Sequence, residues 1–472
     1  MFRMNTKYRI ALLMLCLGFT GCSHHVFGLG SQPQSTGAGP VILAVTDTPP
    51  TMVSILAAQV TLTGATLNPG NVPLFSGSTT IELTRLQTDV AFLSTTQVPV
   101  GNYTSLALTF ANPLLTIEND TNAAIGTCVV GTICTMAPTS TSNLATTISL
   151  SSFSIAANSS QGLLMDVNLD NLLSASLGAD FGAGTTASAF IPAGAGAPLV
   201  EAEDVVGQVA NINAANNTFT LQNATGSISL TVDNTGTFFQ FPSNVCTTSV
   251  FACLQANQIV SVDIGIEATG AIVARNVVFE DADNSDTEVE GTITATNVGQ
   301  QQFTIVPLTE SSAVSGLNIG VAATAHYSVS PQTPFDVDFV HGDNTQITTN
   351  CCLFTTATDL AVGQQVTIRR NANSSGTLIN ADRVRLRSTR ITANVTQIGA
   401  PIFFLYNLPS IYSGNDITQI EVRTSTPTIL SENNTAIVFT DISNNVLASV
   451  RGPLFNVSGT RTLVASKVKL KP

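Results

Sequence analysis

The chain has 472 residues, of which 44% are hydrophobic, 10% are charged and none is tryptophan. The charged fraction is far below the roughly 25% of an ordinary globular domain, while the apolar content is enough for several cores. These values exclude a disordered acidic protein, a coiled coil and a protein with many membrane-spanning helices. A catalytic lysine in the body of the chain is also excluded, because no lysine occurs between Lys7 and Lys467.

The N-terminus carries an export signal. Residues 1–21 combine a basic start with an apolar run of ten residues, too short for a spanning helix, which needs about 20. Cys22 follows Thr20 and Gly21, a pattern that resembles the lipobox of bacterial lipoproteins, where the cysteine thiol is acylated before cleavage. Residues 22–40 are rich in Gly, Ser, Pro and Gln and would form a flexible tether. We therefore expect a lipid-anchored protein of the cell envelope, at the outer membrane, with a plainly secreted protein as the alternative.

Export to an oxidising compartment favours disulfide bonds among the remaining cysteines. These six are Cys128, Cys134, Cys246, Cys253, Cys351 and Cys352. The first four are spaced for two local bridges, the first with the second and the third with the fourth. The adjacent last two would form a vicinal bridge or stay reduced. Six cysteines allow about 15 pairings, so the local pairing is a preference.

Short strands are predicted along almost the whole chain after position 40. Runs of five to eight residues rich in Thr, Val, Ile and Phe alternate with turns rich in Asn, Gly, Asp, Ser and Pro. Clear examples are 59–64, 105–110 and 365–369. One short helix is predicted over 163–173, and no long apolar stripe with the helical period occurs. The pattern predicts an all-β fold.

An internal repeat begins after residue 200. Each copy opens with a strand, a turn and a strand that contains phenylalanine, and each ends with an Ala-x-x-Val segment. These final segments start at Ala274, Ala381 and Ala465, so they lie 107 and 84 residues apart. Because this spacing is far longer than a solenoid repeat, each copy is predicted to form a small barrel or sandwich with its own core. The third copy is degenerate and lacks the Gly-Gln pair that the second has at Gly363-Gln364.

The repeat, V-x-G-x-I, F-T-I, V-G-Q-x-V and G-x-L-x-A-x-x-V, resembles an uncharacterised domain family found in tandem in bacterial secreted lipoproteins. The resemblance implies small OB-like β-barrels. The motifs at 46–49, 60–64 and 100–106 resemble a second uncharacterised family, which implies a prealbumin-like β-sandwich. Neither family brings a known activity. The predicted architecture is a β-sandwich at 41–199 followed by three small β-barrel-like repeats at 203–280, 286–388 and 389–472.

Motifs of the common active sites are absent from the sequence. A serine triad needs a histidine, and outside the tether only His326 and His341 occur. No G-x-S-x-G, H-E-x-x-H or phosphate-binding loop is found, and no spacing singles out a carboxylate pair for glycoside hydrolysis. We therefore expect a non-enzymatic binding or structural module without a cofactor. The alternative is an envelope hydrolase that acts on carbohydrate through an unidentified carboxylate pair.

Two acidic segments are weak candidates for metal binding. The first holds Asp281, Asp283 and Asp286, whose alternating oxygens suit calcium, although the glycine of an EF-hand loop is missing. A solvated acidic linker is its alternative. In the second, Asp336 and Asp338 would share one strand face and His341 would close the site, with a polar loop as the alternative.

The basic residues gather at the C-terminal end. Positions 22–368 hold two basic and 25 acidic residues, whereas 369–472 hold 12 basic and five acidic residues. In the last strands of the second and third copies, the period of two places basic side chains on one face. The candidates are Arg383, Arg385, Arg387, Lys467 and Lys469.

These faces have two interpretations. They bind an external anion, such as lipid A phosphate or an acidic polysaccharide, or the acidic part of the same chain neutralises them. The expected partners are a membrane, through the lipid anchor, and an anionic polysaccharide or an envelope protein. Nucleic acid is not expected, because aromatic and basic residues do not interleave.

Overall fold

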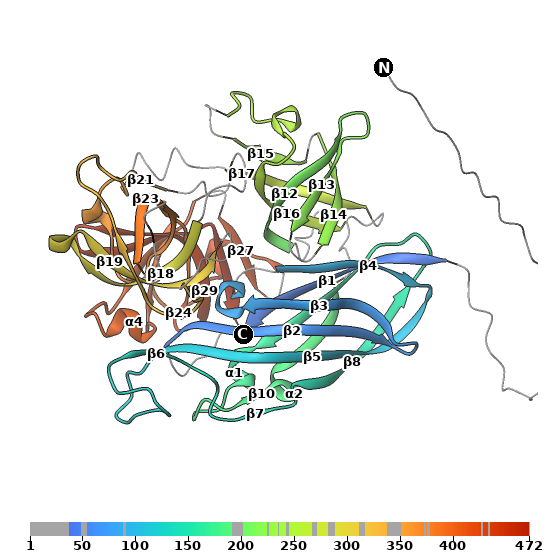
Figure 1. The fold of residues 1–472 in the computed structure, drawn as a ribbon, viewed down its shortest axis with the longest axis horizontal. Helices are drawn as coiled ribbons and strands as arrows, with labels where there is room; N and C mark the ends of the chain where they lie inside the picture. The colour runs from blue at the N-terminus through green and yellow to red at the C-terminus, as the bar shows by residue number, and fades with distance from the viewer. Residues whose placement is uncertain are drawn as a thin grey trace, which may run out of the picture. The chain divides into compact units, whose positions relative to one another are not determined.

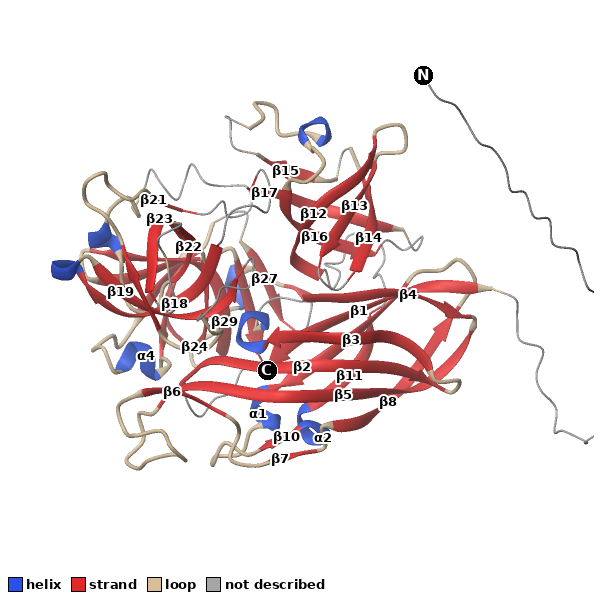
Figure 2. Ribbon diagram, viewed as in Figure 1, coloured by secondary structure: helices blue, strands red, loops and turns tan. Residues whose placement is uncertain are grey.

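The computed structural model describes residues 37–471 apart from the following short segments: 49–53, 88–90, 191–201, 224–225, 235, 242–244, 267–270, 282–287, 311–316, 338–350, 372–373, 375–377, 426–427 and 433–434. The predicted signal peptide, Cys22 and nearly all of the tether lie outside these residues. Strands dominate the described chain and its helices are short, which confirms the predicted all-β fold (Figure 2).

The first domain is a sandwich of two sheets (Figure 1). One sheet has the order β11-β9-β1-β4, in which β1 runs parallel to β9 and antiparallel to β4. The other has the order β3-β2-β5-β6, and β8 also pairs with β5. The strands are β1 (Ala38–Thr48), β2 (Ser54–Asn68), β3 (Val72–Glu82), β4 (Ala91–Pro99), β5 (Gly101–Glu118), β6 (Ile133–Met136), β8 (Ala145–Ile155), β9 (Gln161–Asn168) and β11 (Thr185–Phe190). A small pair, β7 (Thr141–Ser142) and β10 (Ala179–Asp180), and the short helices η1 (Leu83–Leu86), α1 (Leu169–Leu172) and α2 (Phe181–Gly184) complete the domain.

Strand β1 is buried on both faces. Val41, Leu43 and Val45 point into the core of the sandwich, whereas Ile42 and Ala44 belong to the core of the first repeat. A strand with both faces covered is apolar throughout, as the segment Val41–Val45 is.

The helix predicted over 163–173 is mostly wrong. Leu163, Met165 and Val167 alternate into the sandwich core from β9, and only one helical turn, α1, follows. The turn begins where the Asn168 side chain accepts a hydrogen bond from the Asn171 amide, so the strand ends at a capping residue.

The first repeat is a small closed barrel. Its strands are β12 (Ala202–Asn213), β13 (Thr218–Asn223), β14 (Gly226–Val232), β15 (Phe238–Gln240), β16 (Ile259–Ile266) and β17 (Ile272–Asp281), with η2 (Phe251–Cys253) before β16. The sheet order is β14-β13-β12-β16-β17-β15, and a parallel pairing of β14 with β17 closes five strands into a ring. Strand β15 lies outside the ring, parallel to β17 at the edge of the sheet.

The second repeat has the same topology. Its elements are β18 (Glu288–Asn297), η3 (Val298–Gln300), β19 (Gln302–Glu310), β20 (Ala323–His326), β21 (Phe335–Val337), η4 (Ala357–Asp359), β22 (Gln365–Arg370) and β23 (Leu378–Leu386). Parallel β20 and β23 close the ring, and β21 runs beside β23 as β15 does beside β17.

The third repeat keeps the ring but splits its last strand. Its elements are β24 (Ser388–Gly399), β25 (Ile402–Tyr406), α4 (Ser410–Ser413), β26 (Ile420–Arg423), β27 (Ile429–Glu432), β28 (Thr435–Ala436), η5 (Phe439–Asp441), β29 (Leu447–Val457), β30 (Thr460–Val464) and β31 (Lys467–Lys471). Strand β30 closes the ring against β26, and β31 continues it to pair with β27.

The same turn precedes the fourth ring strand in all three repeats. Asn257, Gly363 and Asn445 have positive φ angles of 75°, 88° and 67°. Their amides donate to Val209, Ile293 and Val395, the corresponding residues of the first strands. Asparagine tolerates the left-handed conformation, so the third repeat forms this turn without the Gly-Gln pair.

Each repeat has a core of its own, and each core also includes a few side chains from a neighbouring module. The core of the third repeat includes Leu56 and Ala57 of β2 together with Val306 and Leu308 of β19. Phe455 of β29 belongs to the core of the second repeat. Residues 36–472 form one compact unit for this reason.

Candidate ligand pocket and the charged residues

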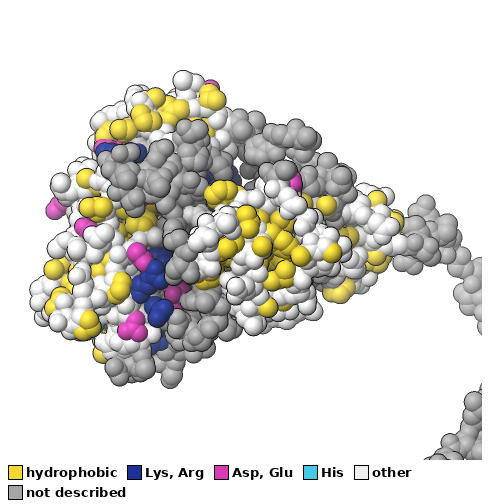
Figure 3. All heavy atoms as spheres, turned by 90° about the horizontal axis from the view of Figure 1, so that it is seen from above, with side chains coloured by type: hydrophobic (Ala, Val, Ile, Leu, Met, Phe, Trp, Pro, Cys, Tyr) yellow, Lys and Arg dark blue, Asp and Glu magenta, His cyan; other side chains and the backbone are white. Residues whose placement is uncertain are grey.

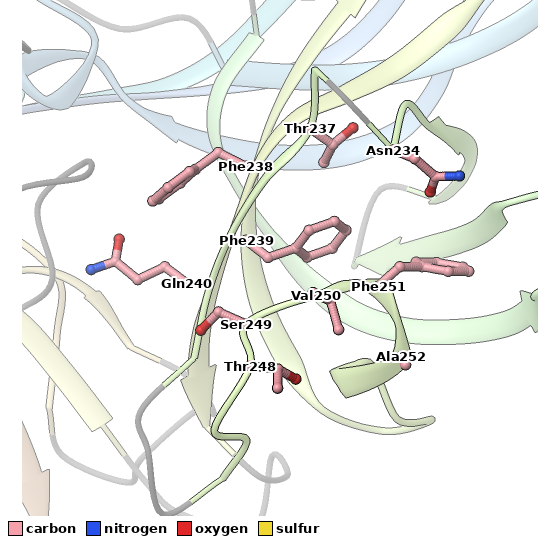
Figure 4. A pocket seen from close by; sticks show the side chains of 10 residues that line it. All are labelled: Asn234, Thr237, Phe238, Phe239, Gln240, Thr248, Ser249, Val250, Phe251 and Ala252. Carbon is pink, nitrogen blue, oxygen red and sulfur yellow. The ribbon is translucent and has the colours of Figure 1, made fainter.

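An open pocket of about 910 Å³ lies at the edge of the first barrel (Figure 4). Ten residues line it, and they come from two segments, 234–240 around β15 and 248–252 before and within η2. These segments follow the third ring strand, β14, and precede the fourth, β16. The pocket therefore lies in the segment that connects β14 to β16, and this segment is not needed to close the ring.

Strand alternation distributes the pocket's aromatic side chains. Phe239 points into the barrel and is 8% exposed, with its ring 6.3 Å from that of Phe251. Phe238 and Gln240 project to the opposite side of β15 (Figure 4). Phe238 is 48% exposed, and Val250 in the second lining segment is 44% exposed. The pocket thus presents apolar surface to solvent, which is uncommon for a phenylalanine in a small domain.

The second segment of the pocket is held in place by local bonds. A disulfide joins Cys246 to Cys253, with 5.8 Å between their Cα atoms, and closes the loop that contains the lining residues. The Ser249 hydroxyl accepts a hydrogen bond from the Phe241 amide at 3.1 Å and donates to the Phe241 carbonyl at 3.3 Å. These bonds fix the loop against the end of β15, so the pocket is formed before any ligand arrives.

The polar groups of the pocket are neutral. Asn234, Gln240, Thr248 and Ser249 supply amides and hydroxyls, and none of the ten lining residues has an ionisable side chain. The Gln240 Oε1 atom is shielded from solvent and has no hydrogen-bond partner within the described protein. Such a pocket can bind a ligand, but none of its lining residues could act as a general acid or base, and none could activate the Ser249 hydroxyl as a nucleophile.

Residues Arg383 and Arg385, predicted to bind an anion, contact an aspartate of the same repeat. Both project from β23 on the outer face, while Val384 and Leu386 are buried, as the period predicted. The Arg383 Nε atom donates to Asp336 Oδ2 at 2.7 Å, and Arg385 Nε lies 3.5 Å from Asp336 Oδ1. Figure 3 shows basic and acidic side chains interleaved in one cluster on a surface that is otherwise mostly uncharged.

Arg387 acts on a buried glutamate, Glu290. Burial tends to raise the pKa of Glu290, but the charges of four arginines bring it below its ordinary value. The four are Arg85, Arg387, Arg390 and Arg451. Arg85 belongs to the sandwich, and its guanidinium lies 3.0 Å from the Glu290 carboxylate of the second repeat.

Arg85 is positioned by the cap of a short helix. The Glu82 carboxylate is buried and accepts hydrogen bonds from the amides of Ala58, at 2.6 Å, and Arg85, at 3.2 Å. The carboxylate thereby satisfies the first amides of η1, which holds Arg85 near Glu290.

The lysines of β31 lie in two environments. All three lysines are half-exposed, but the amino group of Lys471 is shielded from solvent. Burial lowers the pKa of Lys471 to about 8, against the opposing charges of Asp47 and Asp166 in the sandwich. Burial also raises the pKa of Asp47 well above its ordinary value.

The candidate metal ligands are not brought together within the described residues. Asp283, Asp286, Asp338 and His341 lie outside the described residues, as does the side chain of Asp281 in β17. Asp336 is described, and it contacts the two arginines named above. No group of three or more His, Cys, Asp or Glu side chains suitable for a metal occurs in the part of the chain that the structure covers.

The six cysteines form three local disulfides. Besides the pocket bridge, Cys128 joins Cys134 with Cα atoms 5.6 Å apart, and the adjacent Cys351 and Cys352 form the vicinal bridge. Of the two possibilities for the last pair, the structure has the bonded one.

A known family matches only part of the chain. Residues 38–180 match the model of a family described as a domain of unknown function (DUF4382). This match covers most of the sandwich and none of the repeats. No curated protein matches the chain. Among the described helices, none is long and apolar enough to cross a membrane.

The sequence analysis did not identify the pocket. The available signal was the pair Phe238-Phe239 at the edge of the Cys246–Cys253 loop. In a two-residue period, two consecutive phenylalanines cannot both point into the barrel, so one of them must face outward.

Proposed function

We propose that the chain is a non-enzymatic, lipid-anchored binding protein of the cell envelope, and that the pocket of the first repeat contacts its ligand. The observation that carries this proposal is the composition of the pocket, which combines exposed aromatic surface with neutral amides and hydroxyls. Apolar pockets with a few polar groups are typical of binding sites.

The barrel topology supports the proposal. In the first repeat the third and fifth ring strands, β14 and β17, are parallel, and the fifth lies between the third and the fourth. We interpret this order as OB-like, an architecture that binds oligomeric ligands with its strands and loops. We include in the proposal the OB-like assignment of the repeats and the prealbumin-like assignment of the sandwich.

A second candidate function is recognition of an anionic glycan or a lipid head group. It is favoured by Lys467 and Lys469, which are half-exposed on one face of β31. Arg383 and Arg385 contact Asp336, so their charge is partly offset within the molecule.

The alternative hydrolase would need an accessible carboxylate pair. Asp47 and Asp166 influence each other's charge, but Asp47 is 2% exposed, so a polymeric substrate cannot reach it.

The pocket proposal predicts pocket-dependent retention on envelope material. The mature chain is incubated with the polysaccharide fraction and the outer-membrane vesicles of a Gram-negative envelope, and bound protein is measured after washing. Phe238→Ala combined with Val250→Ala should reduce retention about tenfold, because it removes the exposed apolar surface of the pocket. No reducing ends should be released from the polysaccharide.

Two results of this experiment would contradict the pocket proposal. Retention that the pocket variant leaves unchanged, but that Lys467→Gln with Lys469→Gln abolishes, would favour the anionic candidate. Release of reducing ends by the purified chain would favour the hydrolase instead.

The lipid anchor predicts membrane association that depends on Cys22. In an expressing bacterium, the wild-type chain should sediment with the membranes, and Cys22→Ser should appear in the soluble fraction, because the variant lacks the acylated thiol. Mass spectrometry of the mature N-terminus should show acyl chains in the wild type alone. An unmodified Cys22 in the mature chain would contradict the anchor.

A further inference from the structure

We propose that the pocket of the first repeat takes an uncharged saccharide chain; this inference rests on the proposed function and names its ligand class. Within the described residues, this pocket combines an accessible cavity with side chains that the fold does not require.

The three repeats provide an internal comparison. Parallel register aligns Phe239 with Val277, Phe335 with Val384 and Leu430 with Val468, and these valines end the three Ala-x-x-Val segments. The residues one position earlier are Phe238, Pro334 and Ile429. An outward phenylalanine therefore occurs in the first repeat alone, and the barrel forms without it in the other two.

The same strand register identifies the residues that correspond to Gln240 in the other two repeats. Gln240 corresponds to Asp336 in the second repeat and to Ser431 in the third. Asp336 contacts Arg383 and Arg385. Gln240 instead places a neutral amide beside Phe238 on the outer face of β15 (Figure 4). Its Oε1 atom is shielded from solvent and has no partner in the described protein, so it can accept from a ligand hydroxyl only after the side chain turns outward.

The chemistry of the pocket matches a sugar ring. A pyranose has faces of C–H groups, which pack on the apolar face of a phenyl ring, and an edge of hydroxyls, which pair with amides and hydroxyls. Phe238 and Gln240 supply an aromatic face and a neutral amide on one side of β15, and Phe251, Asn234 and Thr248 line the other side. The open shape of the pocket admits a residue within a chain as well as a free end.

Charge excludes the other ligands that stack on aromatic residues. Single-stranded nucleic acid needs a cationic groove along its phosphates, and an acidic glycan needs basic side chains. The pocket has no ionisable lining residue, and positions 22–368 hold 25 acidic residues against two basic ones. An anion would therefore be repelled from this part of the molecule.

Preorganisation makes binding by so few groups feasible. The Cys246–Cys253 bridge and the two hydrogen bonds of Ser249 hold the second lining segment in place. Because the loop does not have to be ordered on binding, less of the interaction free energy is lost as conformational entropy.

Affinity electrophoresis tests this inference with the full mature chain. The gels contain one of three uncharged polysaccharides (dextran, a galactomannan or a mixed-linkage β-glucan) or the anionic polygalacturonate. At least one uncharged polymer should retard the chain, and polygalacturonate should not. Phe238→Ala should weaken the retardation at least tenfold, and Gln240→Ala should weaken it several-fold.

The third repeat offers a matched control. Val250 precedes η2 and Val438 precedes η5 at the same place in the turn, and both are exposed. Val250→Ala should weaken the retardation, whereas Val438→Ala should leave it unchanged. The thermal unfolding midpoints of the pocket variants should equal that of the wild type, because the altered side chains are exposed or half-exposed.

The outcomes separate the ligand class from the proposed function. If none of the three uncharged polymers retards the chain while envelope material retains it through Phe238, the ligand class is wrong and the binding function stands. Retardation by polygalacturonate alone also overturns the ligand class. Retardation that Phe238→Ala and Val250→Ala both leave unchanged overturns the pocket as the site.

Discussion

Replacing Glu290 with glutamine is expected to lower the free energy of unfolding by about 3–5 kcal/mol, because it removes one partner of a buried ion pair. Glutamine keeps the volume of the side chain but lacks the charge that lies among four guanidinium groups. The Arg85–Glu290 contact also joins the sandwich to the second repeat, so its loss should separate their unfolding transitions. Urea unfolding followed by far-ultraviolet circular dichroism measures both effects, since the chain has no tryptophan for fluorescence.

The Glu421–Arg423 pair is the control for this prediction. Its two side chains lie two residues apart on one strand, and the arginine side chain is 37% exposed, against 23% for Arg85. The Glu421 side chain is 17% exposed, against 9% for Glu290, so this pair is less buried and Glu421→Gln should shift the urea midpoint less than Glu290→Gln. Equal effects of the two substitutions would show that Glu290 has no special role in joining the modules.

Strand periodicity predicted which face each basic residue occupies but could not predict its partner. Val384 and Leu386 are buried and Arg383 and Arg385 project outward, as alternation requires. The partner, Asp336, lies 47 residues before Arg383, beyond the reach of any local pattern. The pattern was compatible with binding of an external anion and with neutralisation by an acid of the same chain. The structure places Arg383 and Arg385 beside Asp336, an acid of the same chain.

The repeat was predictable from its last strand, although its shared details were not visible in the sequence. Thr237, Thr333 and Thr428 each donate a hydrogen bond to the alanine carbonyl of the local Ala-x-x-Val segment. The threonine lies 37 residues before its alanine in the first and third repeats and 48 residues before it in the second, and the segments between them differ in composition. The correspondence therefore appears only when the strands are paired. Asn445 likewise replaces a glycine through its backbone conformation, which residue type alone does not reveal.

The shared cores were unpredictable for a related reason. Leu56 and Ala57 lie in β2 of the sandwich, and their apolar character is equally consistent with a local core. The domain that packs on these two residues is set by contacts between segments far apart in the sequence. One such contact is the hydrogen bond from the Thr116 hydroxyl to the Gly320 carbonyl at 2.7 Å, between residues 204 positions apart.

The free energy of unfolding is also expected to rise as the pH increases from about 8 towards 10.5, because of Lys471. Burial lowers the pKa of this amine from 10.5 to about 8 in the folded chain, where Asp47, Asp166, Asp170 and Lys469 influence its charge. Between these two values the unfolded chain binds a proton that the folded chain does not, so stability increases with pH. Below pH 8 the amine is charged in both states, and its burial opposes folding by roughly 3 kcal/mol at most.

Lys471→Met isolates this contribution from other groups that titrate in the same range. The folded-state pKa values of Tyr103 and Tyr327 are raised by burial, so these tyrosines make stability fall with pH near 10 in both proteins. Relative to Lys471→Met, the wild type should therefore gain stability in urea unfolding between pH 8 and 10. Lys469→Met, on the same strand face, should show no such difference. Parallel pH profiles of the wild type and Lys471→Met would contradict this prediction. They would mean that solvent reaches the Lys471 amine in the folded chain.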